Sequence, residues 1–407
     1  MIKPLPLATA LLLPLTLPTS IANAGGLWLN EFGDFSAGRA SAGAAAGTDE
    51  AATIIHNPAS ATRVRGSQLF ASAGLFIPRV EFDIEESSPL LGSDNGDEAG
   101  LAAPASSAAY VHDTGSDTWA AGIYLAGMAG AGLEYNRNWV GRYQITETEL
   151  LVLALAPTLA WQITDALSVG VAAQIHYSTL DMKLRIPTSA VTGREDGTVG
   201  LDGDDSGIAY MLGLTWELSS ATRMGLTYQS EIEINFGGQL KFNPAGLQAQ
   251  SDTELTMAQT VRASIHHAVN DRLALDLTLG WDNWAALDNV FVSVDAVGGS
   301  GLEKNWDDTY HYALGFSYAL TPDWDITAGI AYDTNPVDAR DRTADLPVDR
   351  QVRYNAGLRK TLSDRLTIGG YVNYTDLGRA RISTDFLRGQ YSSNEVYTLS
   401  AYLNWAL

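Results

Sequence analysis

The residue types that most often carry enzyme chemistry are sparse in this chain and form no recognisable set. The 407 residues include no cysteine and only six histidines, which excludes thiolate nucleophiles, disulfides and thiolate metal sites. His266 and His267 are adjacent in an expected strand, where neighbouring side chains point to opposite faces and cannot share a metal ion. The acidic run Asp202, Asp204 and Asp205 fits a solvated loop better than a calcium site. The sequence therefore predicts no catalytic residues, no metal site and no cofactor, which leaves binding as the chemistry to explain.

The residues best suited to bind a ligand are apolar and lie in the segment 146–163. Its even-numbered residues from 150 to 154 are apolar, and so are its odd-numbered residues from 151 to 155. A strand that is apolar on both faces is buried on both. In a barrel, the inner face forms an apolar patch of the lumen, which suits an acyl chain, contact with a plug, or both. We therefore select Leu150 and Val152 as hydrophobic ligand contacts.

The elements that must position these residues are strands, because most of the chain after residue 67 alternates with a period of two. From residue 309 to 320, odd positions are small or polar and even positions are large and apolar. No apolar run after the N-terminal region reaches the roughly 18 residues that a membrane helix requires. The large apolar faces end in aromatic residues, as the interfacial girdles of membrane barrels do: Tyr310, Tyr332, Tyr354, Tyr374, Tyr397 and Trp405.

The connections between these strands alternate in length, which is typical of outer-membrane barrels. Short polar turns alternate with longer loops rich in glycine and acidic residues, at about 85–103, 128–145, 188–205, 243–252, 296–305, 336–349 and 384–392. Gly127, Gly130 and Gly132 are thereby assigned to a loop. The sequence predicts an all-β fold, a 14-stranded antiparallel transmembrane β-barrel, with strands at about 68–84, 104–113, 116–127, 146–163, 166–187, 206–218, 221–242, 253–268, 271–295, 306–320, 322–335, 350–362, 364–383 and 393–407.

The N-terminal region has a different pattern and divides into two parts. Residues 1–24 combine Lys3, an apolar stretch broken by prolines, and the small-x-small site Ala22-Asn23-Ala24, and this predicts a cleaved signal peptide. Residues 25–66 do not alternate, but contain Leu27, Trp28 and Leu29, which are costly to leave in water. We expect this segment to be a plug inside the lumen of a barrel formed by residues 67–407, with a disordered periplasmic tail as the alternative.

The charge balance narrows the class of partner. Net charge is -22, from 25 basic and 47 acidic residues. Nucleic-acid binding needs a basic footprint, so a nucleic-acid partner is not expected. The predicted localisation is the outer membrane of a Gram-negative bacterium, where lipid, lipopolysaccharide and the barrel-assembly machinery are the expected partners.

Three blocks of sequence resemble the FadL family of outer-membrane long-chain fatty acid transporters. The first runs from Gly26 through Phe32 to Gly38-Arg39-Ala40 and Asn57-Pro58-Ala59. The second runs from Asn138 to Trp161. The third begins at Asn305-Trp306-Asp307-Asp308-Thr309-Tyr310 and continues to Leu346-Pro347. The blocks occur in the order of the family and span most of the mature chain, although the chain ends in Leu407, where many outer-membrane barrels end in an aromatic residue.

The resemblance implies a hatch-plugged barrel that captures its ligand near the third and fourth extracellular loops. The ligand would then reach an apolar pocket touched by the mature N-terminus and leave through a lateral opening at a kinked strand. On this basis Leu27, Trp28 and Leu29 are candidate ligand contacts, and Asn57, Pro58 and Ala59 are a motif that shapes the hatch. A carboxylate head would need a cation, and we select Arg142 and Lys304 because each adjoins one of these blocks; a solvated loop cation is the alternative for both.

The function expected from these residues is passive uptake of long-chain fatty acids or similar hydrophobic molecules through hatch rearrangement and lateral exit. The same fold could instead import aromatic or aliphatic hydrocarbons. An outer-membrane enzyme would need a nucleophile with a histidine base, and the sequence suggests no such set. A structural or adhesive barrel is a weaker alternative, because it needs neither a hydrophobic plug nor an apolar lumen patch.

Overall fold

The computed structural model describes residues 27–89, 91–189, 195–243, 246–287, 289–294 and 298–407. The expected signal peptide, residues 1–24, lies outside the described residues. Four short helices come first, and nineteen strand segments follow. The helices are η1 (Ala37–Arg39), η2 (Ala44–Ala46), α1 (Thr53–His56) and η3 (Pro58–Arg63), and η4 (Trp284–Leu287) lies later in the chain. No helix among these residues is long and apolar enough to span a membrane.

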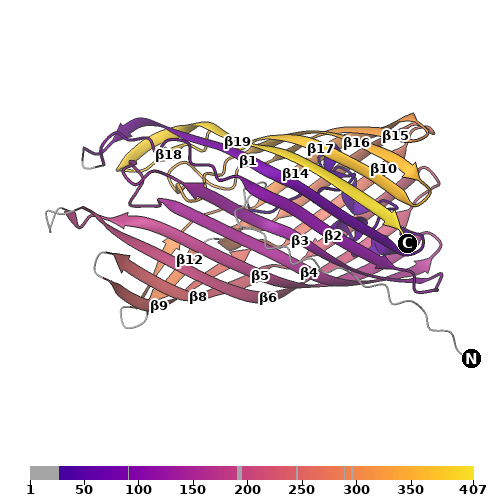
Figure 1. The fold of residues 1–407 in the computed structure, drawn as a ribbon, viewed down its shortest axis with the longest axis horizontal. Helices are drawn as coiled ribbons and strands as arrows, with labels where there is room; N and C mark the ends of the chain where they lie inside the picture. Colours follow the sequence, from indigo (N-terminus) through magenta and orange to yellow (C-terminus); the bar gives the residue numbers. More distant parts are fainter. Residues whose placement is uncertain (1–26, 90, 190–194, 244–245, 288, 295–297) are drawn as a thin grey trace, which may run out of the picture.

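The strand segments form one closed antiparallel sheet (Figure 1). They are β1 (Gln68–Ser87), β2 (Ala103–His112), β3 (Trp119–Glu134), β4 (Glu147–Thr164), β5 (Leu167–Ile186), β6 (Gly197–Glu217), β7 (Thr222–Gln229), β8 (Ile232–Asn243), β9 (Leu247–Met257), β10 (Thr260–Ala268), β11 (Leu273–Asp282), β12 (Asn289–Val294), β13 (Gly298–Glu303), β14 (Thr309–Thr321), β15 (Trp324–Asp333), β16 (Gln351–Ser363), β17 (Leu366–Asp376), β18 (Ile382–Ser383) and β19 (Leu387–Ala406). The sheet closes because β1 pairs with β2 on one edge and with β19 on the other.

The predicted 14-stranded antiparallel barrel is confirmed. The pairs β7/β8, β9/β10, β11/β12 and β13/β14 each count as one interrupted wall strand, and β18 is a short piece beside β19. A closed barrel leaves no unpaired sheet edge, which is what the hydrocarbon core of a membrane demands. The C-terminus lies at the end of the barrel that carries the short turns (Figure 1).

The alternation in the sequence corresponds to the two faces of the wall. On β14, Thr309, His311 and Ala313 are buried inside, whereas Tyr310 and Tyr312 are about half exposed on the outside. The aromatic residues that end the apolar faces are also exposed, at 37–51% of their surface for Tyr310, Tyr332, Tyr354, Tyr374, Tyr397 and Trp405. A second exposed aromatic group lies near the short turns, and in it Trp119 and Trp161 stack with ring centroids 5.5 Å apart.

Five predicted loops were partly wrong, because β3, β6, β9, β13 and β19 extend into them. Residues 128–134 belong to β3, because their pairing with β4 continues from Ala129 to Glu134 after one irregular residue. Residues 197–205 belong to β6, where they pair with β5 up to Ile186. These two segments lack an apolar outer face, so their sequence resembles that of loops although backbone pairing continues there. The predicted strands 221–242 and 271–295 are each interrupted, the second by η4.

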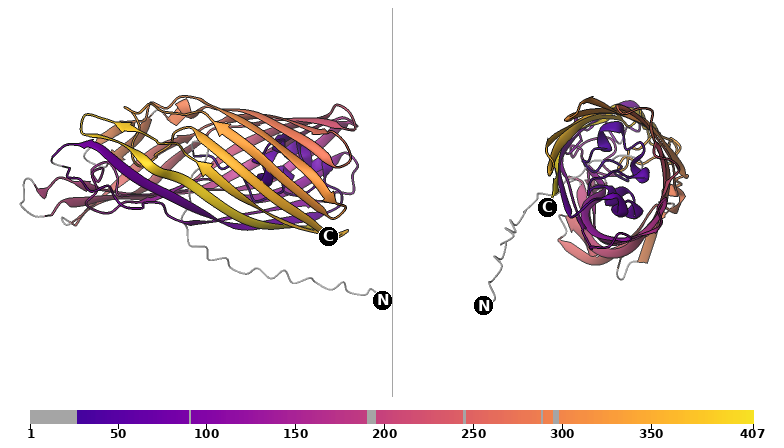
Figure 2. Two further views of the ribbon diagram at one scale, coloured as in Figure 1. Left: turned by 90° about the horizontal axis from the view of Figure 1, so that it is seen from above. Right: turned by 90° about the vertical axis from the view of Figure 1, so that its right-hand side faces the viewer.

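The segment 27–66, which we call the hatch, lies inside the ring of strands (Figure 2). Its helix η1 packs against β14 to β17, η2 packs against β7 and β10, and η3 packs against β3 to β6. These strands come from different sides of the barrel, so the hatch crosses the lumen. Most of its residues are buried, including the charged residues Asp34, Arg39 and Glu50.

Glycines in the wall allow the hatch backbone to come into direct contact with the strands. A methyl group at Gly225 would stand 1.8 Å from the carbonyl oxygen of Ala45, and one at Gly329 would stand 2.2 Å from that of Arg39. At Gly170 it would stand 2.4 Å from the amide nitrogen of Ala59. Because real side chains do not approach this closely, only glycine fits at these positions. We call Gly170, Gly213, Gly225, Gly315, Gly329 and Gly357 the glycine ring.

Candidate functional site

The N-terminal end of the hatch lies against an irregularity in β3. The register between β3 and β4 shifts between Gly127 and Ala129, so Met128 is an extra residue in the strand. Such a bulge bends its strand and frees backbone groups from the ladder. The hatch uses them: the amide of Leu29 donates to the carbonyl oxygen of Met128 at 2.8 Å, and Trp28 forms an isolated bridge with Ala129.

The wall next to this bulge is incompletely paired. Within the described residues, β2 pairs with β3 only from Ser107 to His112, so residues 103–106 have no β3 partner in the ladder. Residues 99–101, which precede β2, connect β1 with β3. The amide of Ala99 donates to the carbonyl oxygen of Val80 in β1 at 2.9 Å, and the amide of Leu101 donates to that of Gly132 in β3 at 3.2 Å. The hatch residues Trp28 and Leu29 therefore contact β3 where its pairing with β2 has ended.

Trp28 also reaches a second interruption of the wall. Its indole Nε1 donates to the carbonyl oxygen of Ala258 at 3.0 Å, at the break between β9 and β10. Its ring lies 6.3 Å from that of Trp284 in η4, which in turn lies 5.6 Å from Trp306. Trp28 thus connects the bulge in β3 with an aromatic group on the other side of the lumen.

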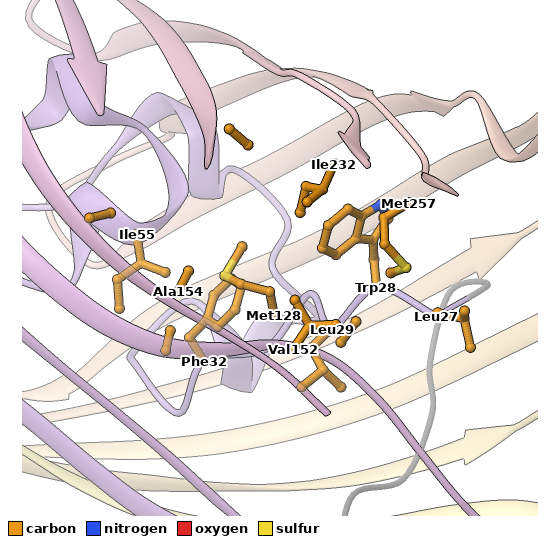
Figure 3. Packing of buried hydrophobic residues seen from close by; sticks show 14 of the residues in the cluster. Leu27, Trp28, Leu29, Phe32, Ile55, Met128, Val152, Ala154, Ile232 and Met257 are labelled. Atoms are coloured by element: carbon orange, nitrogen blue, oxygen red, sulfur yellow. The ribbon is translucent and has the colours of Figure 1, made fainter. Parts of the chain in front are cut away.

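The apolar strand selected from the sequence completes this part of the lumen. Leu150, Val152 and Ala154 of β4 are 4%, 0% and 0% exposed. Val152, Leu29, Met128 and Trp28 lie together in the close-up view (Figure 3). Leu27 is fully buried in the same cluster. All five residues proposed as hydrophobic contacts belong to the large apolar cluster of the lumen, but only Trp28 and Leu29 of them line the cavity described next.

A cavity of about 80 Å³ lies beside this cluster. This volume is well below the roughly 300–1,000 Å³ of a typical small-molecule pocket, so the cavity can hold only part of a long ligand. The apolar residues of its lining, which we call the apolar side, are Trp28, Leu29, Phe32, Ala44, Ala45, Ile55, Met128 and Met211. The polar residues of its lining, which we call the polar side, are Asn30, Ser41, His56, Thr227, Gln229, Thr260, Arg262, Ser264, Thr278 and His311. The lining is therefore amphipathic.

The cationic groups on the polar side already face carboxylates. Arg262 forms a forked pair with Asp282, at 2.7 Å from Nη1 and 3.1 Å from Nη2. The Nδ1 of His311 lies 2.8 Å from Oδ1 of Asp333, whose Oδ2 forms an ion pair with Nη2 of Arg353 at 2.9 Å. Paired charges of this kind hold fixed positions in a low-dielectric interior. The polar side thus offers hydrogen-bonding groups to a ligand, but the positive charges of these two pairs are already balanced by aspartates.

The two cations predicted to meet a carboxylate lie elsewhere. Arg142 lies in the connection between β3 and β4, where its Nη1 donates to the carbonyl oxygens of Leu91 and Trp139 at 2.7 and 3.0 Å. Lys304 is 3% exposed, and its Nζ donates to Asp345 at 2.7 Å and to Thr343 at 2.9 Å. Neither residue lines the amphipathic cavity. Their role as head-group contacts stays a prediction.

The Lys304–Asp345 pair lies outside the membrane-spanning strands and holds two extracellular segments together. Burial alone would raise the pKa of Asp345. The Lys304 ammonium and the hydrogen bonds from Lys304 and Thr343 outweigh burial and hold this pKa below its ordinary value. The geometry therefore fits a tie between loops at least as well as a ligand contact.

The Asn57-Pro58-Ala59 motif fixes the hatch to the wall. Asn57 is extended, with φ of −154° and ψ of 112°, as a residue before proline is expected to be. Its Oδ1 accepts from the amide of Ala59 at 2.9 Å, which caps η3, and its Nδ2 donates to Ala45 at 2.6 Å and to Leu214 of β6 at 3.1 Å. The fully buried side chain therefore ties two turns of the hatch to the barrel.

Sequence reasoning missed Met128, Arg262 and His311. Met128 was assigned to a loop because glycines surround it. Arg262 and His311 had a usable signal, because both share a face with small or polar residues in alternating strands and so point to the lumen. What periodicity could not supply is the neighbour across the lumen, since the hatch residues that complete the cavity are more than 200 positions away.

Comparison with known proteins agrees with this geometry. Residues 15–398 match the family model described as outer membrane protein transport protein (OMPP1/FadL/TodX). The chain is 25% identical to a long-chain fatty acid transport protein of Escherichia coli O6:H1 over 409 aligned positions that cover 90% of each chain. A Pseudomonas aeruginosa FadL homologue has a similar fold, with a TM-score of 0.84, 16% identity and coverage of 94% of this chain and 99% of the other. The P. putida toluene transporter TodX gives a TM-score of 0.73, 17% identity and coverage of 93% and 99%.

Proposed function

The chain belongs to the OMPP1/FadL/TodX family of outer-membrane transport proteins, and we propose that it takes up long-chain fatty acids or similar amphipathic molecules. The observation that carries this proposal is the amphipathic cavity that the hatch forms with Met128 of β3 and with residues of β6, β7, β10, β11 and β14. An acyl chain would lie against Leu29, Met128 and Val152, and burial of apolar surface would supply most of its binding free energy. No energy source is needed, because transport of this kind follows the concentration gradient.

The proposed route leads from the lumen through the barrel wall into the membrane, rather than along the lumen to the end with the short turns. The hatch contacts the wall at backbone distance around the glycine ring, which leaves little room for passage towards the short turns. Next to the bulge in β3, by contrast, residues 103–106 of β2 have no β3 partner in the ladder. A ligand that displaces Trp28 and Leu29 would reach this interval and leave the lumen towards the membrane. We expect lipopolysaccharide around the outer rim and insertion of the barrel by the barrel-assembly machinery.

A second candidate is import of aromatic or aliphatic hydrocarbons. Two ion pairs favour it, Arg262 with Asp282 and His311 with Asp333. The charge of each cation is already balanced by an aspartate, so these pairs offer no excess positive charge to bind the carboxylate of a fatty acid. The curated relative from Escherichia coli is a fatty acid transport protein, and the solved structures of similar fold include a toluene transporter. We rank fatty acids first because half of the cavity lining is polar, which an unsubstituted hydrocarbon would not use.

The test is uptake of labelled oleate and labelled toluene by cells that lack their own transporters of this family. We expect saturable uptake of oleate, and a strong loss of it when Trp28 and Leu29 are both changed to alanine. Phe386→Ala is the matched control, because Phe386 is a large apolar residue that is 71% exposed in a loop. Uptake of toluene without oleate would move the function to hydrocarbons. Uptake of neither would contradict the proposal.

A further inference from the structure

The polar side of the amphipathic cavity contains a hydrogen-bond donor that the protein itself does not use. Asn30 lines the cavity, and its Nδ2 is buried without a hydrogen-bond partner in the described part of the chain. Buried polar groups in proteins are nearly always hydrogen-bonded, so an unused donor in a binding cavity calls for a partner from outside. Asn30 is held in place by Ser41, whose Oγ donates to its backbone carbonyl at 2.6 Å.

The orientation of the Asn30 amide follows from its neighbour. Arg262 can only donate hydrogen bonds, and its Nη2 lies 3.4 Å from Oδ1 of Asn30. If the amide were reversed, two donors would face each other, so Oδ1 must point to Arg262 and Nδ2 must point away. The same arginine is bound at both Nη atoms by Asp282. Arg262 therefore orients the amide, and its charge is balanced before any ligand arrives.

The rest of the cavity determines what such a ligand looks like. Leu29, the residue before Asn30, lies in the apolar cluster and donates its amide to Met128. Trp28 and Phe32 continue the apolar side. A ligand that meets Asn30 with an oxygen atom would therefore have its apolar part directed along Leu29 and Met128, towards the interval where β2 and β3 are unpaired.

We propose that Asn30 is the head-group contact of this cavity and that it donates through Nδ2 to an oxygen of an amphipathic ligand. The oxygen belongs to a carboxyl, hydroxyl or carbonyl group at one end of an apolar chain. This inference rests on the proposed function and adds the specificity: the cavity prefers an oxygen-bearing amphipath to the hydrocarbon of the same length. Asn30 is the specificity-determining residue, and Arg262 is the positioning residue behind it.

The experiment compares three probes of equal chain length: labelled laurate, 1-dodecanol and dodecane. Each is bound to the full-length barrel in lipid nanodiscs, with empty nanodiscs subtracted. Asn30→Leu removes the donor at similar volume, and we expect it to weaken laurate and dodecanol about 5- to 30-fold, as the loss of one buried hydrogen bond implies, without weakening dodecane. Asn235→Leu is the matched control, because it makes the same substitution at an exposed residue of β8 that does not line the cavity.

A second variant separates the two kinds of head and protects against a folding defect. Asn30→Asp keeps the oxygen that faces Arg262 and replaces only the free donor. We expect it to weaken laurate more than dodecanol, because the hydroxyl can donate to the new carboxylate and an ionised head is repelled by it. Equal weakening of all three probes by Asn30→Leu would overturn the assignment of Asn30, and so would a weakening by Asn235→Leu as large as that by Asn30→Leu. If the wild-type barrel binds none of the probes, both the proposed function and the assignment of Asn30 are wrong. If it binds dodecane most tightly, only the assignment of Asn30 is overturned.

Discussion

Substitution of Gly225 by alanine tests whether the hatch is held by its close fit to the wall. A methyl group there would stand 1.8 Å from the carbonyl oxygen of Ala45 and 2.2 Å from its carbonyl carbon. Both atoms belong to the backbone, so no side-chain rotation can relieve the clash, and η2 has to move away from β7. The strand itself tolerates alanine, since the problem is the opposing chain.

The cost follows from the contacts that η2 would lose. Ala45 accepts from Nδ2 of Asn57 at 2.6 Å, and Arg223 donates to the carbonyl oxygens of Ala46 and Gly47, both at 2.6 Å. Overpacking of a well-packed interior costs about 1–3 kcal/mol, and each hydrogen bond from a charged donor contributes about 1.5–3 kcal/mol. We expect the docked state of η2 to lose about 2 kcal/mol, which is roughly a 30-fold shift towards the undocked state.

The assay is hydrogen exchange of the segment 40–50, measured by mass spectrometry on the barrel in nanodiscs. In the docked state the amides of Ala44, Ala46 and Gly47 bond to carbonyl oxygens within the hatch. We expect these amides to exchange roughly 30-fold faster in Gly225→Ala, while the amides of β7 and β10 keep their protection. Gly200→Ala is the control, because its methyl group would meet nothing closer than 3.9 Å. Unchanged exchange in a folded Gly225→Ala barrel, or equal acceleration in the control, would refute the reasoning.

Four further predictions concern the contacts around the site. Lys304→Met should accelerate exchange of the loop around Asp345 at pH 7, because it leaves a buried carboxylate without its cation; an unchanged loop with loss of laurate binding would favour the head-group role instead. In the wild type, the low pKa of Asp345 means that this tie is fully present above the ordinary carboxyl value of about 3.9 and is lost as pH falls below it. The protection factors of the loop amides, which are corrected for intrinsic exchange at each pH, should therefore be steady from pH 7 to 5 and fall below about pH 4. Trp28→Phe keeps an aromatic ring but removes the hydrogen bond to Ala258, and we expect the amide of Leu29 to exchange about fivefold faster, which equal rates would contradict. Val152→Asn should weaken dodecane and laurate alike by about tenfold through lost apolar contact, while the lipid-facing change Leu155→Val leaves binding intact; a loss confined to laurate would mean that Val152 does not line the chain path.

The barrel could be predicted from the sequence because lipid on one side and a partly polar lumen on the other impose a period of two. That constraint operates only where the strand faces hydrocarbon. Beyond the exposed tyrosines it disappears, which is why residues 128–134 and 197–205 were taken for loops although they remain paired. The interruption at η4 has no periodic signal, because Trp284 and Leu287 turn inwards to meet the hatch.

The candidate site was predictable in its parts and not in its assembly. Leu27, Trp28, Leu29, Leu150 and Val152 are apolar at positions where exposure would be costly, and all five are buried in the apolar cluster of the lumen, although only Trp28 and Leu29 line the cavity. The roles of the charged residues could not be predicted in the same way, because the sequence does not show which cation is paired with a carboxylate in the folded protein. Lys304 and Asp345 are 41 positions apart, and Arg262 and Asp282 are paired only because β10 and β11 bring them together. The choice of Arg142 and Lys304 over Arg262 reflects that missing information.

The glycine ring has a consequence for the whole cell. An outer membrane protects a bacterium because it excludes bulky hydrophilic compounds such as many antibiotics, and every wide barrel placed in it threatens that protection. Here the hatch lies so close to the wall that a single methyl group would not fit between them at six positions. A transporter of hydrophobic molecules built in this way can therefore lie in the outer membrane without leaving an open aqueous pore through it.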